Sequence, residues 1–412
     1  MAGEAAHTGE HRMHGLDGGW TEADWSAWTL AEADELLREV EGAGRAVALE
    51  SVSPRPFSAA ARVRTTSGTV VVKRHARTVR SVESLREEHG FAQWLAAAGA
   101  PVAAPLRMRN GSSAWECVGA TGQAWTCEVF PVAPGEDVYA QAVSWTPYGC
   151  VEHARAAGAA LGRLHAASRG YAAASRGKAP LVTSYTLIPA ADVAQAVEAY
   201  LAARPQLEAW LRRQRGELAV ETVVRRWLRP QLERLHGEGL LTAAAAVEPL
   251  WTHNDWHGSN LMWSGAQADA RVTAVIDFGL ADRTCAAQDV ATALERSVVD
   301  WLGLRGGVEA DLEQAAALLA GYEEQVPLTA RERRTIAEML PVVHCEFALS
   351  EAEYFLSVLG DAARAQVAWE GYCVGHCAWF ATAAGQRLME WMRWWADGAT
   401  GRAIGRATEA ER

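Results

Sequence analysis

Asp255, Asn260 and Asp277 have the residue types and the spacing that phosphoryl transfer requires. Asn260 follows Asp255 by five residues, and Asp277 follows Asn260 by seventeen, at the start of an Asp-Phe-Gly sequence. Transfer of a phosphoryl group needs a carboxylate near the acceptor hydroxyl and oxygen ligands for a magnesium ion that bridges the phosphates. We therefore expect Asp255 to be the catalytic base, and Asn260 and Asp277 to bind Mg²⁺.

These three residues are more informative together than separately. Alone, Asp277 could end a core strand, and Asp255 and Asn260 could cap local turns. Together with His253 they reproduce the order of a kinase catalytic loop and its magnesium-binding turn. The apolar run 272–276 also predicts a strand that would pair with 261–263 and carry Asp277 at its end.

Lys73 and Glu88 are expected to act on the nucleotide. Residues 70–73 read Val-Val-Val-Lys, a β-branched strand ending in a lysine of the kind that kinases place on the α- and β-phosphates. Glu88 lies on the next predicted helix and would hold Lys73 through an ion pair, with Glu83 and Glu87 as competitors for this role. Alone, Lys73 would be an edge-strand charge and Glu88 a solvated helix face, but their order before the catalytic loop favours function.

The rest of the nucleotide site is less distinct. No Gly-x-Gly-x-x-Gly occurs in the hairpin expected at 53–63, so small residues such as Ser58 would have to let the backbone approach the phosphates. Glu128 and Phe130 are expected to bind adenine through backbone groups at the hinge.

The segment 344–355 mixes carboxylates with aromatic residues at helical spacing. Carboxylates beside aromatic rings suit an ammonium group, through ion pairing and cation–π contact. We therefore expect Glu346 or Glu351 to contact an amine on the acceptor. The alternative is that Phe347 and Tyr354 belong to the core while the glutamates face solvent.

The elements that must position these residues fall into two groups. Strands are expected at 47–52, 61–66, 69–73, 115–118 and 125–130, with one helix opened by a capping box at Thr29 and Glu32 and another over 81–98. Pro131, Pro134 and Gly135 mark a hinge. Beyond it, helices are expected at 154–168, 191–204, 205–217, 220–236, 286–299, 308–326, 329–349 and 367–395.

This pattern predicts an α+β protein of two lobes, a small antiparallel-sheet lobe and a larger, mostly helical lobe. We expect a disordered tail at 1–19, a nucleotide-binding lobe at 20–130, a catalytic and substrate lobe at 131–396, and a frayed tail at 397–412. The sequence assigns no role to the Arg- and Glu-rich segment 170–250.

Composition excludes several classes of protein. The chain has 412 residues and a net charge of −11, which argues against nucleic acid as a partner. The seven cysteines are scattered and odd in number, so a disulfide framework is not expected, and Cys373 and Cys377 are expected to pack in the core. With no signal peptide and no apolar run long enough to span a membrane, cytoplasm is the expected compartment. The oligomeric state is left open.

The catalytic-loop sequence resembles that of the aminoglycoside phosphotransferase and choline kinase group. Members carry a loop similar to His-Gly-Asp-Leu-His-x-Gly-Asn followed by Ile-Asp-Phe, and here Asn254 and Trp256 replace the usual Gly and Leu. Three further segments are similar to those of the family: 158–165, which ends in Leu-His, 289–291, which reads Asp-Val-Ala, and 321–322, which reads Gly-Tyr.

The resemblance implies a protein-kinase-like fold that uses ATP or GTP with Mg²⁺ to phosphorylate a hydroxyl of a small molecule, such as an aminoglycoside or an amino alcohol. A protein substrate is disfavoured because Gly279 leads within a few residues to Asp289, which leaves no activation segment. The alternative is a nucleotide-binding module without catalysis, although every charged catalytic position is filled.

Overall fold

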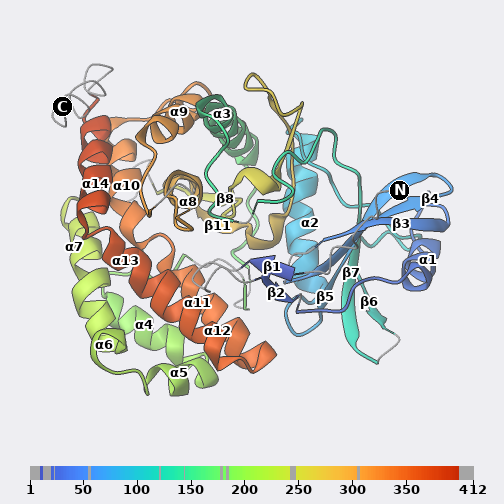
Figure 1. The fold of residues 1–412 in the computed structure, drawn as a ribbon, viewed down its shortest axis with the longest axis horizontal. Coiled ribbons are helices and arrows are strands. Elements are labelled where there is room, and N and C mark those ends of the chain that lie inside the picture. Colours follow the sequence, from blue (N-terminus) through green and yellow to red (C-terminus); the bar gives the residue numbers. More distant parts are fainter. Residues whose placement is uncertain are drawn as a thin grey trace.

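A sheet with one long helix and a larger group of helices form the two parts of the molecule (Figure 1). The structure is a computed structural model that describes residues 10–12, 20–22, 24–53, 57–119, 122–142, 144–176, 180–181, 185–241, 247–303 and 307–398. Among these residues, no helix is long and apolar enough to cross a lipid bilayer.

The N-terminal sheet is antiparallel and has the strand order β3-β4-β5-β7-β6. Its strands are β3 (Ala46–Val52), β4 (Ala59–Thr65), β5 (Gly68–Ala76), β6 (Trp115–Val118) and β7 (Ala124–Pro131). The period of two is clear in β4, where Ala61 and Val63 are buried and Arg62 and Arg64 are exposed. The pairing of β5 with β7 sets Lys73 opposite Glu128.

Two helices accompany this sheet. In α1 (Leu30–Arg38), Thr29 and Glu32 form the predicted capping box. Ser81 caps α2 (Val82–Ala97), and Gly99, with a φ of 81°, follows its end. Figure 1 shows α2 between the sheet and the helical part, where Glu88 is buried.

Two short antiparallel pairs of strands enclose the residues predicted to do chemistry. The strand β8 (Pro249–Thr252) pairs with β11 (Asp282–Cys285), and β9 (Leu261–Trp263) pairs with β10 (Val272–Val275). Residues 253–260 connect β8 to β9, and residues 276–281 connect β10 to β11. The two connections are therefore held side by side, which confirms the predicted hairpin before Asp277.

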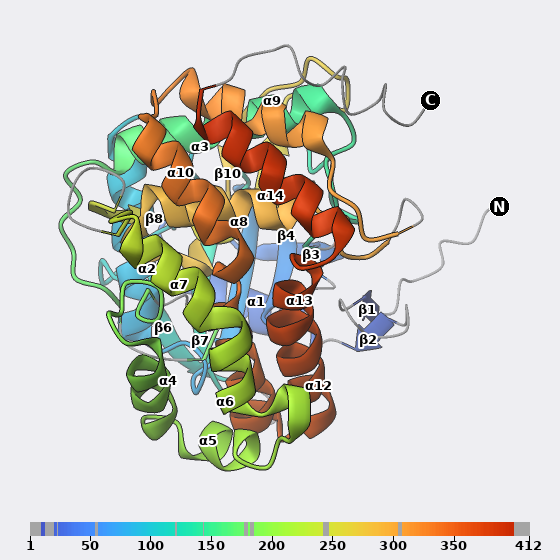
Figure 2. The ribbon, with the colours of Figure 1, turned by 90° about the vertical axis from the view of Figure 1, so that its left-hand side faces the viewer.

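Helices make up most of the C-terminal part. They are α3 (Val151–Ser168), α4 (Val193–Ala202), α5 (Pro205–Leu211), α6 (Val220–Val223), α7 (Arg229–Gly237), α8 (Ala286–Val298), α9 (Leu312–Glu323), α10 (Ala330–Met339), α11 (Cys345–Tyr354), α12 (Ala362–Gln366), α13 (His376–Trp379) and α14 (Ala383–Ala396). The helix α10 packs between α7 and α14 (Figure 2). Together with the antiparallel sheet, these helices confirm the predicted α+β class.

Two helices predicted as continuous are divided, and this part of the prediction was wrong. The segment 329–349 is interrupted by a 3-10 turn at Leu340–Val342, because Pro341 lacks an N–H and cannot continue an α-helix. The segment 367–395 begins as a π-helical stretch, Val367–Gly375, and is divided again at Thr382, whose side chain accepts a hydrogen bond from Gly385 N and caps α14.

The chain ends are described only in part. β1 (Glu10–Arg12) pairs with β2 (Trp20–Glu22), so three residues of the segment expected to be a disordered tail are in a strand. Residues 1–9 and 13–19 of that segment, and 399–412 of the expected C-terminal tail, lie outside the described residues.

Candidate active site

Asp255 is held at both of its carboxylate oxygens. Oδ1 lies 2.9 Å from Nη1 of Arg296 and 3.5 Å from Nε2 of His257, while Oδ2 accepts a hydrogen bond of 2.9 Å from Nδ2 of Asn260. Burial favours the neutral acid, but Arg296 and His257 outweigh burial and hold the pKa of Asp255 well below its usual value. Asp255 is thus an ionised carboxylate of fixed orientation, which is what orienting a hydroxyl requires.

The backbone of the catalytic segment, residues 253–260, is held by a side chain from α8. The N–H groups of His253 and Asn254 donate to the two oxygens of Asp289 at 2.9 and 2.8 Å. His165 Nε2 lies 3.0 Å from Asp289, and its Nδ1 lies 2.8 Å from the hydroxyl of Tyr322. The residues of the three family-like segments therefore meet in one buried network that fixes the catalytic segment.

The departure from the family loop at Asn254 has a conformational explanation. Asn254 has a φ of 60°, in the left-handed region that glycine adopts freely and that asparagine tolerates better than most residues. Its Oδ1 accepts hydrogen bonds from Thr252 and Thr284, at 3.0 and 3.3 Å. Asparagine thus replaces glycine without changing the path of the loop, and its side chain ties together β8 and β11.

Close packing of α3 on α9 sets the positions of His165 and Tyr322, the two residues of the network that these helices carry. A Cβ atom on Gly158 would lie 1.9 Å from the carbonyl oxygen of Leu318, and one on Gly321 would lie 2.0 Å from that of Arg155. Only glycine allows the two helix backbones to approach this closely. The glycines of the family-like segments are thereby explained by packing.

Lys73 and Asp277 form an ion pair between the N-terminal sheet and the C-terminal part of the molecule. Nζ of Lys73, from the sheet, lies 2.9 Å from Oδ1 of Asp277, which follows β10 and has a left-handed φ of 59°. Burial opposes both charges, but Asp277 and Glu128 raise the pKa of Lys73, and Lys73 lowers that of Asp277. Both side chains are therefore charged.

The residues expected to bind Mg²⁺ offer the hard oxygen donors that this ion prefers. Nδ2 of Asn260 donates to the main-chain oxygen and to Oδ2 of Asp255, both at 2.9 Å, so the amide oxygen is the Asn260 atom that could bind a cation. Asp277 supplies a carboxylate, and 41% of its side chain is exposed. The donor set therefore fits magnesium.

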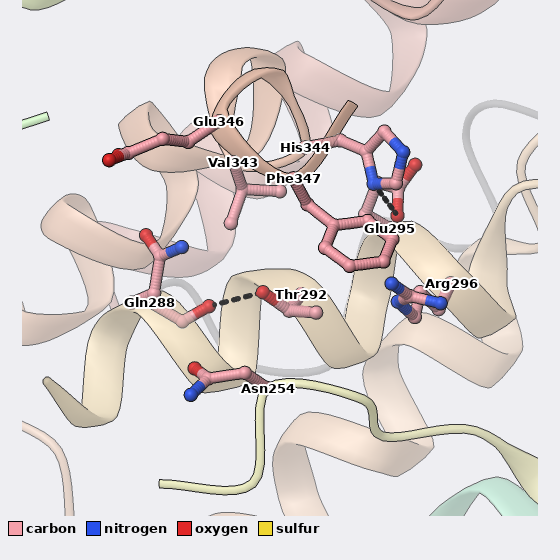
Figure 3. Close-up of a pocket in the computed structure, with 9 residues that line it drawn as sticks. All are labelled: Asn254, Gln288, Thr292, Glu295, Arg296, Val343, His344, Glu346 and Phe347. Atoms are coloured by element: carbon pink, nitrogen blue, oxygen red, sulfur yellow. Dashed lines mark hydrogen bonds and ion pairs between the residues drawn. The ribbon is translucent and has the colours of Figure 1, made fainter. Parts of the chain in front are cut away.

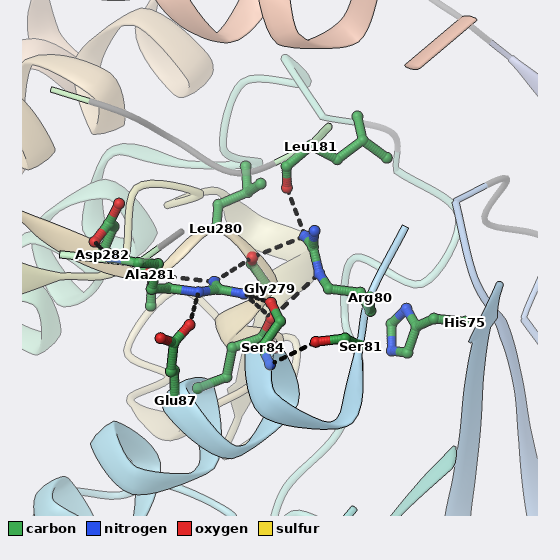
Figure 4. A network of polar contacts seen from close by, with 12 residues as sticks. His75, Arg80, Ser81, Ser84, Glu87, Leu181, Gly279, Leu280, Ala281 and Asp282 are labelled. Carbon is green, nitrogen blue, oxygen red and sulfur yellow. Dashed lines mark hydrogen bonds and ion pairs between the residues drawn. The ribbon is translucent and has the colours of Figure 1, made fainter. Parts of the chain in front are cut away.

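Glu88 has partners that the sequence did not indicate, and one of them, Arg80, is seen beside Gly279 in Figure 4. Its Oε1 contacts Arg176 and lies 3.2 Å from Nε of Arg80. Both arginines donate to the carbonyl oxygen of Gly279 at 2.9 Å, and Arg176 also donates to that of Ala281 at 3.0 Å. Instead of the expected pair with Lys73, Glu88 thus connects α2 to the backbone that follows Asp277.

Glu128 lies beneath Lys73 as a buried carboxylate. Its two oxygens lie 2.9 Å from Nε2 of His75 and 2.7 Å from Nε2 of His89. Burial opposes its charge, but the two histidines lower the pKa of Glu128 well below its usual value. The side chain thus belongs to the charge network of Lys73, and the expected contact of its backbone with adenine stays a prediction.

Two more residues expected to contact the nucleotide, Phe130 and Ser58, lie in or next to the N-terminal sheet, and their contact with a nucleotide stays a prediction. Phe130 is in β7 opposite Val71, and the preceding Val129 accepts a hydrogen bond from Leu106 N. Ser58 directly precedes β4, while residues 54–56 of the same loop lie outside the described residues.

A pocket lies beside the catalytic segment, between α8 and the start of α11 (Figure 3). Its lining combines apolar, amide and charged side chains from Asn254, Gln288, Thr292, Glu295, Arg296, Val343, His344, Glu346 and Phe347. Arg296 connects this pocket to Asp255, and we call it the acceptor pocket after the role proposed for it below.

The two carboxylates expected on the acceptor side differ in their partners. The oxygens of Glu346 accept hydrogen bonds from the N–H groups of Thr186 and Leu187, at 3.0 to 3.1 Å. Glu351 is buried, and burial, with Asp255 and Glu295 adding to it and Arg296 opposing, raises the pKa of Glu351 to about 8. Neither glutamate faces solvent, so that part of the alternative expectation was wrong, whereas the aromatic residues Phe347 and Tyr354 are core as it supposed.

Arg296 is the main residue that the sequence analysis missed. It is buried, pairs with Asp255, and lies over the rings of Trp145 and Phe347, each 5.2 Å from the guanidinium carbon. It lies on α8 seven residues after Asp289, two helical turns along the same face. That spacing is the one signal in the sequence that could have identified it.

Comparisons with known proteins agree with this arrangement. Residues 53–339 match the family model described as the phosphotransferase enzyme family. An aminoglycoside phosphotransferase from Alicyclobacillus acidocaldarius is 16% identical in sequence, with a TM-score of 0.50 over 86% of this chain and 94% of its own. A microcompartment-associated aminopropanol kinase is 17% identical, with a TM-score of 0.50 over 87% of this chain and 100% of its own. No curated protein sequence matches the chain significantly.

Proposed function

Because the chain belongs to the phosphotransferase enzyme family, as its family resemblance predicted, we propose that it is an ATP-dependent kinase that transfers the γ-phosphate to a hydroxyl of a small molecule. Membership of the family makes the chain a small-molecule phosphotransferase. The use of ATP as phosphoryl donor and the chemical nature of the acceptor are what we propose. The observation that carries the proposal is the meeting of Lys73, from one part of the molecule, with Asp277 and the Asp255–Asn260 pair from the other.

Each residue has a role that follows from its position. Asp255 would orient the acceptor hydroxyl and accept its proton as the phosphoryl group is transferred. Arg296 holds Asp255 ionised, and Lys73 would contact the phosphates. Asn260 and Asp277 would hold Mg²⁺, which when bound neutralises charge on the phosphates.

The acceptor is proposed to carry an amine. Three buried carboxylates, Glu295, Glu346 and Glu351, lie on the acceptor side, and the charge of Arg296 is paired with Asp255. A cationic group on the acceptor would pair with the buried charge of Glu295 and could accept the neighbouring carboxyl groups as hydrogen-bond partners. An aminopropanol kinase among the structures of similar fold is compatible with this choice, although at 17% identity the likeness shows the fold alone.

The experiment is a transfer assay over a panel of hydroxyl compounds. The purified chain is incubated with ATP or GTP and Mg²⁺, and aminoglycosides, amino alcohols, hydroxy amino acids and neutral sugars are analysed for a phosphorylated product. We expect product with an amine-bearing acceptor and none with Asp255→Ala. Magnesium-dependent nucleotide binding by calorimetry, without product from any acceptor, would instead favour the non-catalytic binding module.

A further inference from the structure

Glu295 and His344, which line the acceptor pocket, meet His376 behind them although the three residues are far apart in the sequence. Glu295 is in α8, His344 directly precedes α11, and His376 begins α13. Nδ1 of His376 lies 2.8 Å from Oε1 of Glu295, and Nδ1 of His344 lies 3.7 Å from Oε2. One ligand atom from each residue lies within 4.8 Å of the others, and all three side chains are buried. We propose that these residues bind a divalent transition-metal ion of the Zn²⁺ class.

The distances fit a tetrahedral site. With Zn–N and Zn–O bonds of about 2.0–2.1 Å, neighbouring ligand atoms lie roughly 3.3–3.4 Å apart. The two histidines approach different oxygens of Glu295, His376 at 2.8 Å from Oε1 and His344 at 3.7 Å from Oε2, and these separations lie on either side of that value. Small side-chain rotations would therefore bring the three atoms to ligand distance.

The donor set also indicates which metal and which coordination. Two imidazoles with one carboxylate are ligands that zinc accepts, whereas Mg²⁺ prefers oxygen donors alone. Three protein ligands leave a fourth position for water or a ligand. Glu295 and His344 both line the acceptor pocket, so that position would open into the pocket (Figure 3).

Glu351 is a second, independent observation that points to a metal. Its Oε2 lies 3.9 Å from Nε2 of His344, the ring nitrogen other than the one near Glu295. The glutamate is 3% exposed, and Oε2 accepts no hydrogen bond from the described residues. A carboxylate behind a histidine orients the ring and makes its other nitrogen a better metal ligand. Glu351 would have this role once His344 shifts slightly toward it.

The charges of the cluster balance when a dication is present. Glu295 carries a negative charge in the interior, the buried carboxyl group of Glu351 lies nearby, and Arg296, next to Glu295, is paired with Asp255. Buried charges are stable only when they are paired or bind a metal. A dication with two neutral imidazoles offsets the buried charge of Glu295 and would attract the Glu351 carboxyl group. Trp301 stacks on the ring of His376 at 3.7 Å between centroids, which holds the ring in place.

The test measures metal binding without any acceptor or nucleotide, so its result does not depend on the proposed function. The chain is freed of metal with a chelator and titrated with Zn²⁺ by calorimetry, and with Co²⁺ followed by its visible absorption. His7, His11 and His14 are replaced by Asn in every sample, because a group of histidines near one end of the sequence could bind metal adventitiously. We expect one equivalent of zinc and the strong visible bands of tetrahedral cobalt.

Variants decide whether the cluster is the site. His344→Gln and His376→Gln should abolish the cobalt bands, and Glu351→Gln should weaken zinc binding by about 10–100-fold. His236→Gln, on α7 and hydrogen-bonded to the carbonyl oxygen of Ala190, is the matched control and should bind like the parent. Thermal unfolding shows whether each variant folds. If a variant of a metal ligand does not fold, the weaker zinc binding expected of Glu351→Gln is the test. No binding by the parent, or binding that survives both ligand substitutions, would overturn the proposal.

Discussion

The catalytic segment, residues 253–260, and the acceptor wall, the side chains of Glu295, His344, Glu346, Glu351 and His376, are stabilised differently. The catalytic segment is held through its backbone, by Asp289 and the network of His165 and Tyr322 behind it. The acceptor wall is held through side chains that contact one another across three helical segments, with Glu295 near His344 and His376. One region is thus fixed by a single dominant residue and the other by a shared cluster of charges.

This difference predicts which substitutions affect turnover with every acceptor and which affect only some acceptors. A backbone-held segment keeps its geometry whatever the exposed side chains are, so the chemistry can stay constant while the acceptor wall varies. We therefore expect changes behind the catalytic segment to affect folding and turnover with every acceptor. Changes in the acceptor wall should affect one acceptor more than another.

The largest effect is expected from Asp289→Asn. It removes a buried charge that accepts hydrogen bonds from two N–H groups and contacts His165, so the free energy of unfolding should fall by about 3–5 kcal/mol. Urea unfolding measures this, with Asp192→Asn at the exposed start of α4 as a control that should change little. An unfolding free energy within about 1 kcal/mol of wild type would show that the segment is held by other contacts.

The same variant gives a pH dependence. Burial opposes the charge, but His165 and His253 lower the pKa of Asp289 below its usual value near 4. A depressed pKa contributes stability above the unfolded-state pKa and loses it as the pH falls through the folded-state pKa. The stability difference between wild type and Asp289→Asn should therefore be constant above about pH 5 and shrink below about pH 4. A difference that grows on acidification would contradict the account.

Arg296→Gln should lower kcat for every acceptor by about 10–100-fold, which is roughly 1.4–2.7 kcal/mol. It removes the cation at 2.9 Å from Asp255, so the carboxylate loses its orientation and its charge partner. Arg296→Lys keeps the charge but not the planar geometry, so its kcat should lie between those of wild type and Arg296→Gln. Steady-state kinetics at saturating nucleotide measures the effect. A wild-type kcat in a folded Arg296→Gln protein would separate Arg296 from the chemistry.

Gly321→Ala tests the packing behind the catalytic segment. Its methyl group would lie about 2.0 Å from a carbonyl oxygen of α3, so we expect a loss of about 1–3 kcal/mol in unfolding free energy. Gly237→Ala, in α7 with open space around it, is the matched control and should be neutral or slightly stabilising. Equal unfolding free energies for the two variants would show that α3 can move away from α9 at little cost.

The smallest effect is expected on the acceptor wall. Glu346→Gln keeps the shape of the side chain but removes its charge, so the KM for an amine-bearing acceptor should rise by about 5–10-fold, with the KM for ATP nearly unchanged. The same measurement on Glu351→Gln tests the second carboxylate. Wild-type kinetics in both variants, or a true acceptor without a cationic group, would end the proposal that these residues favour an amine.

The sequence predicted the catalytic segment better than the acceptor wall, for a physical reason. Asp255, Asn260 and Asp277 lie in the two connections between the strand pairs β8–β11 and β9–β10, so their spacing along the chain already encodes their proximity. Glu88 was expected beside Lys73 and instead contacts Arg176, because a helix face alone does not reveal a partner from a distant loop. The meeting of Glu295 with His376 depends on how three helices pack, which no local pattern records.

The central claim is that Asp255 directs phosphoryl transfer to a small-molecule hydroxyl, and one experiment tests it most directly. The phosphorylated acceptor is quantified by mass spectrometry in a single turnover with wild type and Asp255→Asn, after nucleotide affinity has been measured for both. The account predicts equal nucleotide affinity within about twofold and a transfer rate lower by about 10²–10⁴-fold in the variant. Transfer by Asp255→Asn at the wild-type rate would contradict it.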